Sequence, residues 1–146
     1  ITGHTFTAHT AACAAGLAVQ RIMDRENLVQ KVADDGIYLR QRLEETLGQH
    51  THIGDIRGRG FFQGIELVED RETKEPFEPG SQIFYRVLKT GFEKGLIVYP
   101  TGGNVDGVKG DQIIVAPPYN ATRDELDEIV DLLGPTIDQA IASWTA

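Results

Sequence analysis

Apolar residues recur every three or four positions in four stretches of the chain, which is the spacing of amphipathic helices. The first stretch, 11–23, is rich in alanine. The second covers 25–47, with Gly36 at a position where another apolar side chain is expected. The third follows Ser81, which can cap a helix, and ends near Gly95. The apolar face of this third helix is expected to consist of Ile83, Phe84, Val87, Leu88 and Phe92.

The fourth helix is predicted from a threonine and a glutamate at capping-box spacing, Thr122 and Glu125. Its apolar positions continue to Ile141. Gly134 and Pro135 lie inside this stretch and are expected to kink or interrupt the helix, because proline lacks an amide hydrogen.

Between these helices, β-branched and aromatic residues replace the helical spacing and predict strands. The predicted strands are 52–57, 61–69, 96–99 and 111–116. The order helix, helix, strand, strand, helix, strand, strand, helix predicts an α+β fold. In this fold, helices cover one face of a small, mostly antiparallel sheet.

The alanine-rich stretch 11–23 predicts a helix of small cross-section, buried against a larger neighbour than this chain provides. The simpler explanation is the high helix propensity of alanine. Cys13 lies among the alanines and is predicted to be a small buried apolar group rather than a reactive thiolate. The chain begins at Ile1 rather than at methionine, so an upstream portion is expected to be missing.

Charge and cysteine content restrict the possible partners. The chain has 22 acidic and 14 basic residues and a net charge of −8, which argues against nucleic-acid binding because phosphates are bound by excess lysine and arginine. One cysteine excludes an internal disulfide and fits a reducing, cytoplasmic location. No apolar run approaches the roughly 18 to 20 residues of a membrane helix, and no membrane partner is expected.

Motifs for named chemistries are incomplete. The glycine-rich loop 101–110 has Val108 where a phosphate-binding P-loop needs lysine. No metal site is expected, because further ligands at suitable spacing are missing around the two histidine pairs, His4 with His9 and His50 with His52. The residues by themselves show no complete catalytic constellation.

Three stretches resemble the class III aminotransferases, which are pyridoxal-phosphate enzymes of fold type I. Residues 3–10 (GHTFTAHT) and the helix after them are similar to the family pattern H-G-x-T-[FY]-[ST]-x-H-P. Residues 53–67 (IGDIRGRGFFQGIEL) are similar to V-G-D-x-R-G-x-G…G-[IV]-E-[LF]. The third stretch combines 95–98 (GLIV) with 116–118 (APP) and the capping box. The resemblance covers nearly the whole chain in the family's order.

The resemblance implies that residues 1–24 end the large cofactor-binding domain and that residues 25–146 form the small C-terminal domain. It places the Schiff-base lysine upstream of the threonine loop, and all five lysines of this chain follow that loop. The implied protein is therefore a C-terminal fragment of a homodimeric aminotransferase. This fragment has no catalytic residue of its own, is inactive alone, and is not expected to bind pyridoxal 5'-phosphate tightly.

The same resemblance assigns Thr5 to the phosphate of the cofactor held by the other subunit, with Phe6 as the aromatic residue beside it. A hydroxyl and backbone amides near a helix start suit a phosphate. Threonines in such a loop can also simply cap and turn the chain.

Two departures from the family pattern concern the substrate. Ile114 stands where the ornithine and 4-aminobutyrate branches carry an arginine, and Tyr99 stands where amine–pyruvate enzymes carry a mobile one. Neither side chain can form a bidentate clamp on a carboxylate. The implied donor is an amine or ω-amino acid and the acceptor a 2-oxo acid such as pyruvate. Tyr99 and Arg59 are the candidate residues at the substrate entrance. Arg59 is there a candidate carboxylate contact, and a solvated or structural role is the alternative. A non-catalytic α+β binding module and an aminomutase of the same fold are the alternative functions.

Overall fold

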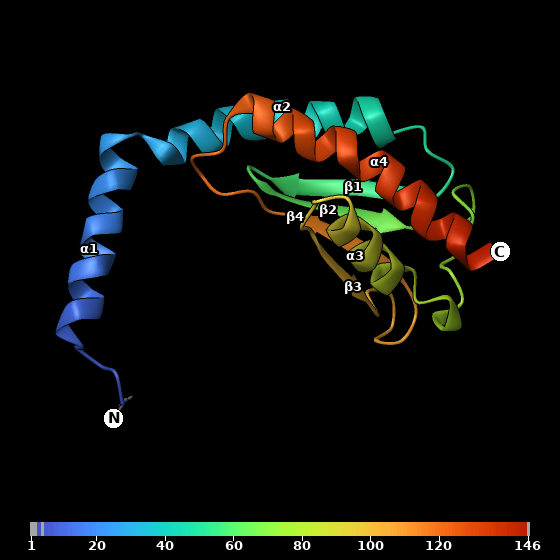
Figure 1. The fold of residues 1–146 in the computed structure, drawn as a ribbon, viewed down its shortest axis with the longest axis horizontal. Helices are drawn as coiled ribbons and strands as arrows, with labels where there is room; N and C mark the ends of the chain where they lie inside the picture. Colours follow the sequence, from blue (N-terminus) through green and yellow to red (C-terminus); the bar gives the residue numbers. More distant parts are fainter. Residues whose placement is uncertain (1–2, 4, 146) are drawn as a thin grey trace.

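The computed structural model describes residue 3 and residues 5–145 and has the predicted α+β architecture. Four antiparallel strands form one sheet, three helices pack on one of its faces, and another helix projects from this body as an arm (Figure 1). The helices are α1 (Thr10–Arg25), α2 (Leu28–Leu47), α3 (Ile83–Glu93) and α4 (Arg123–Thr145). The strands are β1 (Ile53–Arg59), β2 (Phe62–Leu67), β3 (Tyr99–Gly102) and β4 (Asp111–Val115).

The strands follow the order β1-β2-β4-β3, so β1 and β3 are the edges of the sheet. Successive side chains of a strand point to opposite faces. The central-strand positions that face the helices are buried: Gln63, Ile65, Leu67, Ile113 and Val115. The other face, here called the open face, carries the intervening residues Asp55, Arg57, Arg59, Phe62, Gly64, Glu66, Tyr99, Thr101, Gln112 and Ile114.

The hydrophobic core lies between the sheet and the three covering helices. The helical side chains buried in it include Leu39, Leu43, Leu47, Val87, Leu126, Val130, Leu133 and Ile137. Each such side chain stabilises the fold by roughly 1.5–3 kcal/mol relative to an exposed position. The apolar positions predicted for the second and fourth helices therefore form the core.

Helix α2 approaches the turn between β1 and β2 at a pair of glycines. A Cβ atom added to Gly36 would lie 2.4 Å from the Cα of Gly60. Gly60 itself has φ +55°, a left-handed conformation that favours glycine in this tight turn. Because Gly36 has no side chain, α2 contacts the backbone of the β1–β2 turn directly.

A polar cluster joins α2 to α4 at the surface. The Arg42 Nε donates to Asp127 Oδ1 at 2.7 Å, and the Tyr38 hydroxyl lies 2.8 Å from both oxygens of the same carboxylate. The hydrogen bond from Arg42, followed by that from Tyr38, lowers the pKa of Asp127 below its ordinary value. The charged form of Asp127 is therefore the form that the folded chain favours.

Helix α4 begins with the predicted capping box and then runs without interruption. The Thr122 amide donates to Glu125 Oε2 at 2.7 Å, and the Glu125 amide donates to Thr122 Oγ1 at 3.3 Å. The helix continues past Gly134 and Pro135 to residue 145, so the predicted interruption does not occur. Burial of residues on both sides of the proline stabilises the helix against the loss of one hydrogen bond.

Three of the predicted strands begin and end within two residues of the observed ones, whereas the strand predicted over 96–99 is displaced. The Leu96 amide donates to the Gly91 carbonyl at 2.8 Å and closes the end of α3 instead of joining the sheet. Pairing begins only at Tyr99, opposite Ile114. Helix termination therefore uses the residues that the pattern assigned to the strand.

The start of α3 is capped from the sheet rather than by Ser81. Ser81 is buried in a preceding 3₁₀ turn (Pro79–Ser81), and Gln82 has the left-handed φ of 49°. The Phe84 amide donates to Asp111 Oδ1 at 2.8 Å. Burial raises the pKa of Asp111, a residue on β4 that local sequence does not connect with this helix.

The inner face of α3 is rotated from its predicted position. Its buried residues are Ile83, Val87, Thr90 and Gly91. Leu88 and Phe92, which were predicted to be buried, are 44% and 73% exposed. Each lies one position beyond a buried residue, which turns it about 100° around the helix axis.

Helix α1 has no buried residue. The chain bends between α1 and α2 at Asn27, whose φ is 49°, and the arm extends away from the sheet (Figure 1). Cys13 is exposed on the arm, so the prediction of a buried cysteine is wrong for this chain. The described residues provide no surface to cover that part of the helix.

Alanine is expected to have opposite effects at Gly36, which contacts the backbone of Gly60, and at Gly16, which has no neighbour within 4 Å. In Gly36→Ala the new methyl group clashes with backbone, and we expect a loss of about 1–3 kcal/mol in the free energy of unfolding. Gly16→Ala adds a methyl group on α1 with nothing within 4 Å, and we expect a gain of about 0.5–1 kcal/mol in helix stability. Urea unfolding measures the first and helical circular dichroism the second. Equal stability of the chain with and without the Gly36 substitution would contradict the contact.

The lowered pKa of Asp127 predicts acid sensitivity. Its folded pKa lies below its unfolded pKa, so its stabilising effect is present above the unfolded value and is lost as the pH falls through the folded value. Asp127→Asn should therefore lower the urea midpoint at pH 7, and the difference from the wild type should shrink below about pH 4. Glu128→Gln, an exposed neighbour on the same helix, is the control and should change the midpoint little at either pH. A difference for Asp127→Asn that does not depend on pH would refute this role.

Candidate functional site

The turn before α1 carries the residues predicted to contact a phosphate. Residues 5–8 form the turn, and the His9 amide donates to the Phe6 carbonyl at 3.2 Å. The His9 ring caps the helix, because its Nδ1 accepts the Ala12 amide at 3.2 Å. The Phe6 and His9 rings meet edge to face with centroids 6.3 Å apart. Local contacts therefore fix the turn relative to the helix.

Thr5 and Phe6 are both exposed on this turn, Phe6 by 78%. Among the described residues, no group forms a hydrogen bond with the Thr5 hydroxyl. The Ala12 amide is not free to donate to a phosphate, because it donates to His9 Nδ1. Of the predicted phosphate donors, the hydroxyl is accessible and one amide of the first helical turn is occupied.

The open face of the sheet carries the other predicted contact, Tyr99. The strand register places Tyr99 beside Ile114, Ile114 beside Gly64 and Gly64 beside Arg57 in one row across all four strands. Tyr99 is 66% exposed. The two positions at which the sequence departs from the family pattern, Tyr99 and Ile114, are thus direct neighbours on an accessible surface.

The arginine in this row is already neutralised. The Arg57 Nη1 lies 2.9 Å from Glu66 Oε2 and 3.0 Å from Asp55 Oδ2. The hydrogen bond to Glu66, followed by that to Asp55, raises the pKa of Arg57. The hydrogen bond from Arg57 in turn lowers the pKa of Asp55. The row therefore presents a phenol and an aliphatic side chain but no unpaired guanidinium.

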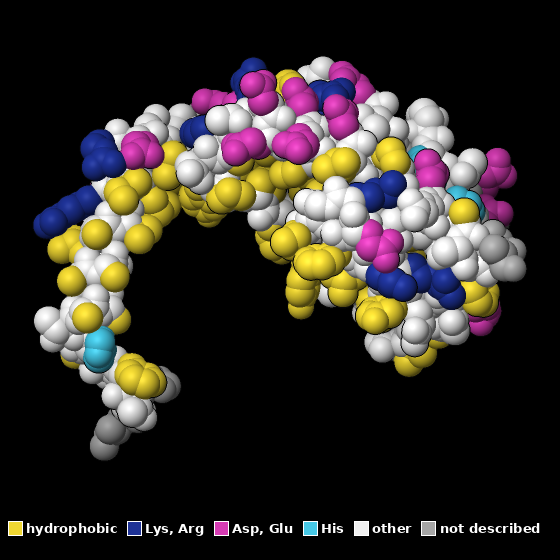
Figure 2. All heavy atoms as spheres, viewed as in Figure 1, with side chains coloured by type: hydrophobic (Ala, Val, Ile, Leu, Met, Phe, Trp, Pro, Cys, Tyr) yellow, Lys and Arg dark blue, Asp and Glu magenta, His cyan; other side chains and the backbone are white. Residues whose placement is uncertain are grey.

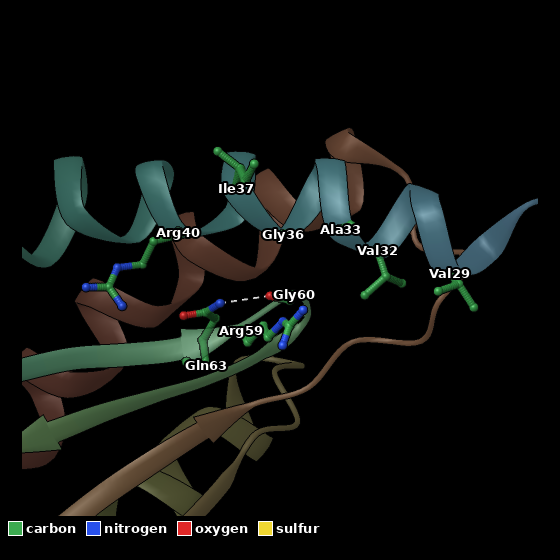
Figure 3. A pocket seen from close by; sticks show the side chains of 10 residues that line it. Val29, Val32, Ala33, Gly36, Ile37, Arg40, Arg59, Gly60 and Gln63 are labelled. Carbon is green, nitrogen blue, oxygen red and sulfur yellow. Dashed lines mark hydrogen bonds between the residues drawn. The ribbon is translucent and has the colours of Figure 1, made fainter.

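Arg59 lies away from Tyr99, because β1 and β3 are opposite edges of the sheet. It lines an open groove of about 550 Å³ between α2 and the β1–β2 turn (Figure 3). The other residues of the groove are Val29, Val32, Ala33, Gly36, Ile37, Arg40, Gly58, Gly60 and Gln63. The structure therefore does not bring the two predicted entrance residues together.

Sequence reasoning missed Gln63 and the groove that it lines. Gln63 is 1% exposed, and its Nε2 donates to the Gly60 carbonyl at 2.8 Å. Its Oε1 is buried without a hydrogen-bond partner among the described residues. The signal in the sequence is a glutamine at an inward position of a strand whose next inward residues are Ile65 and Leu67.

Two of the five lysines are engaged with other groups of the described part of the chain. Lys31 Nζ lies 2.6 Å from Asp35 Oδ2, also donates to the Ala121 carbonyl, and sits 5.6 Å from the centre of the Phe61 ring. Lys74 Nζ donates to the Gly54 carbonyl at 2.7 Å. The others, Lys89, Lys94 and Lys109, lie on α3, at its end and in the loop before β4.

The histidine pairs do not gather metal ligands. Within residues 3 and 5–145, no group of three or more histidine, cysteine, aspartate or glutamate side chains is placed to hold a metal ion. His50 instead lies 2.9 Å from Asp138, and His4 lies outside the described residues. None of the described helices is both long and apolar enough to cross a membrane.

Comparison with known proteins gives one consistent family. The family described as aminotransferase class-III matches residues 2–137. An uncharacterised aminotransferase of Schizosaccharomyces pombe is 45% identical over 139 residues, which are 95% of this chain and 30% of that protein.

Two solved structures are similar over nearly the whole chain. One is an (S)-enantioselective omega-transaminase from Thermomicrobium roseum, with 28% identity, a TM-score of 0.86, and coverage of 97% of this chain and 30% of that one. The other is an amine transaminase from an uncultivated Pseudomonas species in its PLP-bound form, with 29% identity and a TM-score of 0.81. The match covers 96% of this chain and 30% of that one.

The chain thus spans about 30% of the length of the relatives that it matches. Class III aminotransferases use pyridoxal phosphate. Sequence match and fold agree over the whole body and the α1 arm, and the chain belongs to the class III aminotransferase family.

Proposed function

We propose that this chain is the C-terminal part of a pyridoxal-phosphate-dependent transaminase. The intact enzyme transfers an amino group from an amine or ω-amino acid to a 2-oxo acid such as pyruvate. Residues 1–24 belong to the large cofactor-binding domain and residues 25–146 form the small domain. The bend at Asn27, two residues from this boundary, supports the division.

The observation that carries this proposal is the exposed α1 arm. Apolar side chains line the concave side between the arm and the body, and charged side chains gather on the convex side (Figure 2). Leu17 and Ile22 are 52% and 40% exposed although they belong to an alanine-rich helix. A helix of this kind gains most of its stability by packing. The remaining 70% of a relative's length supplies a body of suitable size for it to pack against.

The described residues fit one contact to the cofactor rather than a whole cofactor site. The accessible Thr5 hydroxyl suits a phosphate oxygen, and the exposed Phe6 ring shields that contact from water. When bound, pyridoxal phosphate supplies the electron-accepting ring that amino transfer requires. In this proposal Thr5 reaches the cofactor of the other subunit, so the working enzyme is a homodimer.

Chemistry at the cofactor requires a lysine that this chain does not provide. Transamination needs an amine that holds the cofactor and moves a proton during the reaction. The ammonium of Lys31 is engaged with Asp35 and the Ala121 carbonyl, and Lys74 is bound to Gly54. We therefore propose that the chain alone is inactive.

The substrate assignment rests on the row formed by Tyr99, Ile114 and Arg57. Because Asp55 and Glu66 pair with Arg57, the row offers no unpaired cation to grip a substrate carboxylate. It suits the uncharged part of an amine or of another ω-amino acid better than the carboxylate of ornithine or 4-aminobutyrate. Arg59, on the opposite edge of the sheet, is a second entrance contact only for a carboxylate far from the reacting amine.

Two alternatives make different predictions. An aminomutase of the same fold would share every feature described here and would differ in returning the amino group to its own substrate. A free-standing binding module has no use for an arm without buried residues, which disfavours that alternative. A donor screen of the intact enzyme against pyruvate separates transaminase from aminomutase.

The phosphate contact is tested by Thr5→Ala in the intact enzyme. Loss of one charge-assisted hydrogen bond should weaken cofactor retention by about 1.5–3 kcal/mol. Thr5→Ser keeps the hydroxyl and is the matched control, with cofactor retention close to wild type. Dialysis followed by absorbance of bound cofactor measures both. Unchanged retention in Thr5→Ala would remove Thr5 from the site.

The absence of a suitable lysine is tested by borohydride reduction of the 146-residue chain with pyridoxal phosphate. We expect only substoichiometric labelling spread over the lysines, because none is held beside a phosphate contact. Peptide mass spectrometry locates any reduced adduct, and the intact enzyme serves as the positive control. Stoichiometric labelling of one lysine in the isolated chain would contradict the proposal that this chain does not provide the catalytic lysine.

A further inference from the structure

A glycine occupies the middle of the open face of the sheet. Gly64 is the third of the six residues of β2, a central strand, and pairs with Arg57 on one side and with Ile114 on the other. Glycine weakens the interior of a strand, because it loses more conformational freedom on folding and has no side chain to pack on the neighbouring strands. Such a glycine commonly marks a bulge, a sharp bend, or a place where a ligand or another backbone comes close.

The backbone around Gly64 has neither a bulge nor a strained conformation. Gly64 does not have a left-handed φ, and the register shift of β1 against β2 lies elsewhere, between Ile53 and Asp55. A Cβ atom added to Gly64 would lie 3.6 Å from the Arg57 carbonyl oxygen, an ordinary van der Waals contact, with no closer neighbour in the described part of the chain. The fold of the described residues would therefore accept a side chain at this position.

The missing side chain leaves a gap between larger side chains, here called the Gly64 gap. Phe62 and Glu66 point to the same face from the same strand, each about 7 Å away along it. Arg57 and Ile114 flank the gap from the neighbouring strands, each about 5 Å away. The space above Gly64 is therefore about one side chain wide.

The polar groups beside the Gly64 gap have partners within the chain. Arg57 is bonded to both Asp55 and Glu66, at 3.0 and 2.9 Å. Farther along the open face, Gln112 Nε2 donates to Thr101 Oγ1 at 3.0 Å. A group that enters the gap therefore gains stability by burying apolar surface rather than by forming new hydrogen bonds.

The other side chains beside the gap are mainly apolar and are accessible. Phe62 is 63% exposed, and Tyr99, which follows Ile114 in the same row, is 66% exposed. Ile114 lies between Tyr99 and the gap and is half-buried. The gap thus continues the row to which the proposed function assigns the donor.

We propose that the Gly64 gap receives the alkyl group of the amine donor, so that Gly64 sets the size of the donor that the enzyme accepts. This inference rests on the proposed transaminase function, which brings the donor to Tyr99 and Ile114. Another stretch of polypeptide fits the gap less well, because its amides and carbonyls would need hydrogen-bond partners. The polar side chains beside the gap are already bonded to one another, whereas an alkyl group needs no such partner.

The test measures kcat/KM of the intact enzyme with pyruvate and linear primary amines from propylamine to hexylamine. In the wild type, kcat/KM should rise about three- to fourfold per added methylene while the gap is being filled. Gly64→Val should lower the ratio of kcat/KM for hexylamine to that for propylamine at least about tenfold, and Gly64→Ala should lower it less. Gly80→Ala adds a methyl group on an exposed turn with nothing within 4 Å and is the matched control, with the wild-type ratio.

The ratio of two donors separates selectivity from damage to the fold. A smaller folded fraction lowers the activity toward both donors equally and leaves the ratio unchanged. Gly64→Ala should also not lower the temperature of thermal unfolding, because alanine meets no clash at this position and is the better strand residue. This variant keeps the test decisive if Gly64→Val fails to fold.

The outcomes distinguish this inference from the proposed function. An unchanged ratio in both variants would overturn the inference. An equal fall for all donors in Gly64→Ala, together with a lower unfolding temperature, would assign the gap to another segment of the polypeptide and would also overturn it. A wild type that accepts ω-amino acids but none of these amines would overturn the inference alone. A wild type that accepts neither kind of donor would contradict the proposed transaminase function, and the inference with it.

Discussion

The direct contact between Gly36 and Gly60 sets how closely α2 lies to the sheet. Because neither residue has a side chain, helix backbone and turn backbone meet without an intervening layer. This closeness lets Leu39, Leu43 and Leu47, farther along the same helix, reach the core. Both glycines also line the groove beside Arg59, together with the residues of α2 that precede and follow Gly36. Core and groove are therefore both consequences of one backbone approach.

Electrostatics divides the surface into a paired region and an unpaired one. Between α2 and α4, and on the open face, carboxylates and cations lie within hydrogen-bonding distance, as for Arg42 with Asp127 and Arg57 with Glu66. Such exposed pairs add little stability, but they remove free charge from the surfaces that they occupy. The row beside Tyr99 is left without an unpaired cation by this pairing, whereas Arg59 has no ion pair among the described residues. In a chain with a net charge of −8, Arg59 is thus an arginine without an ion pair among the described residues.

Sequence periodicity predicted the architecture well because most of the core is encoded locally. The buried faces of α2 and α4 and the capping box at Thr122 follow from spacing, and three of the four strands follow from residue type. The errors occur where a distant residue decides. Asp111 caps α3 from the sheet, and the end of α3 uses Leu96, which had been assigned to a strand. No pattern within α3 or β3 contains that information.

The candidate site shows a different limit of sequence reasoning. Family resemblance identified Thr5 and Tyr99 as single positions, and both prove accessible, but the residues that neutralise Arg57 come from two strands and emerge only from the register. Gln63 was missed because one buried amide does not disturb the alternation of a strand. The α1 arm is the opposite case, because its sequence pattern predicts packing that the fold of the described residues does not contain. Its alanines predict a surface that packs against a neighbour, and no residue of the helix is buried by the described part of the chain. A sequence can therefore specify one half of an interface, while the geometry of the site depends on groups that only the fold brings together.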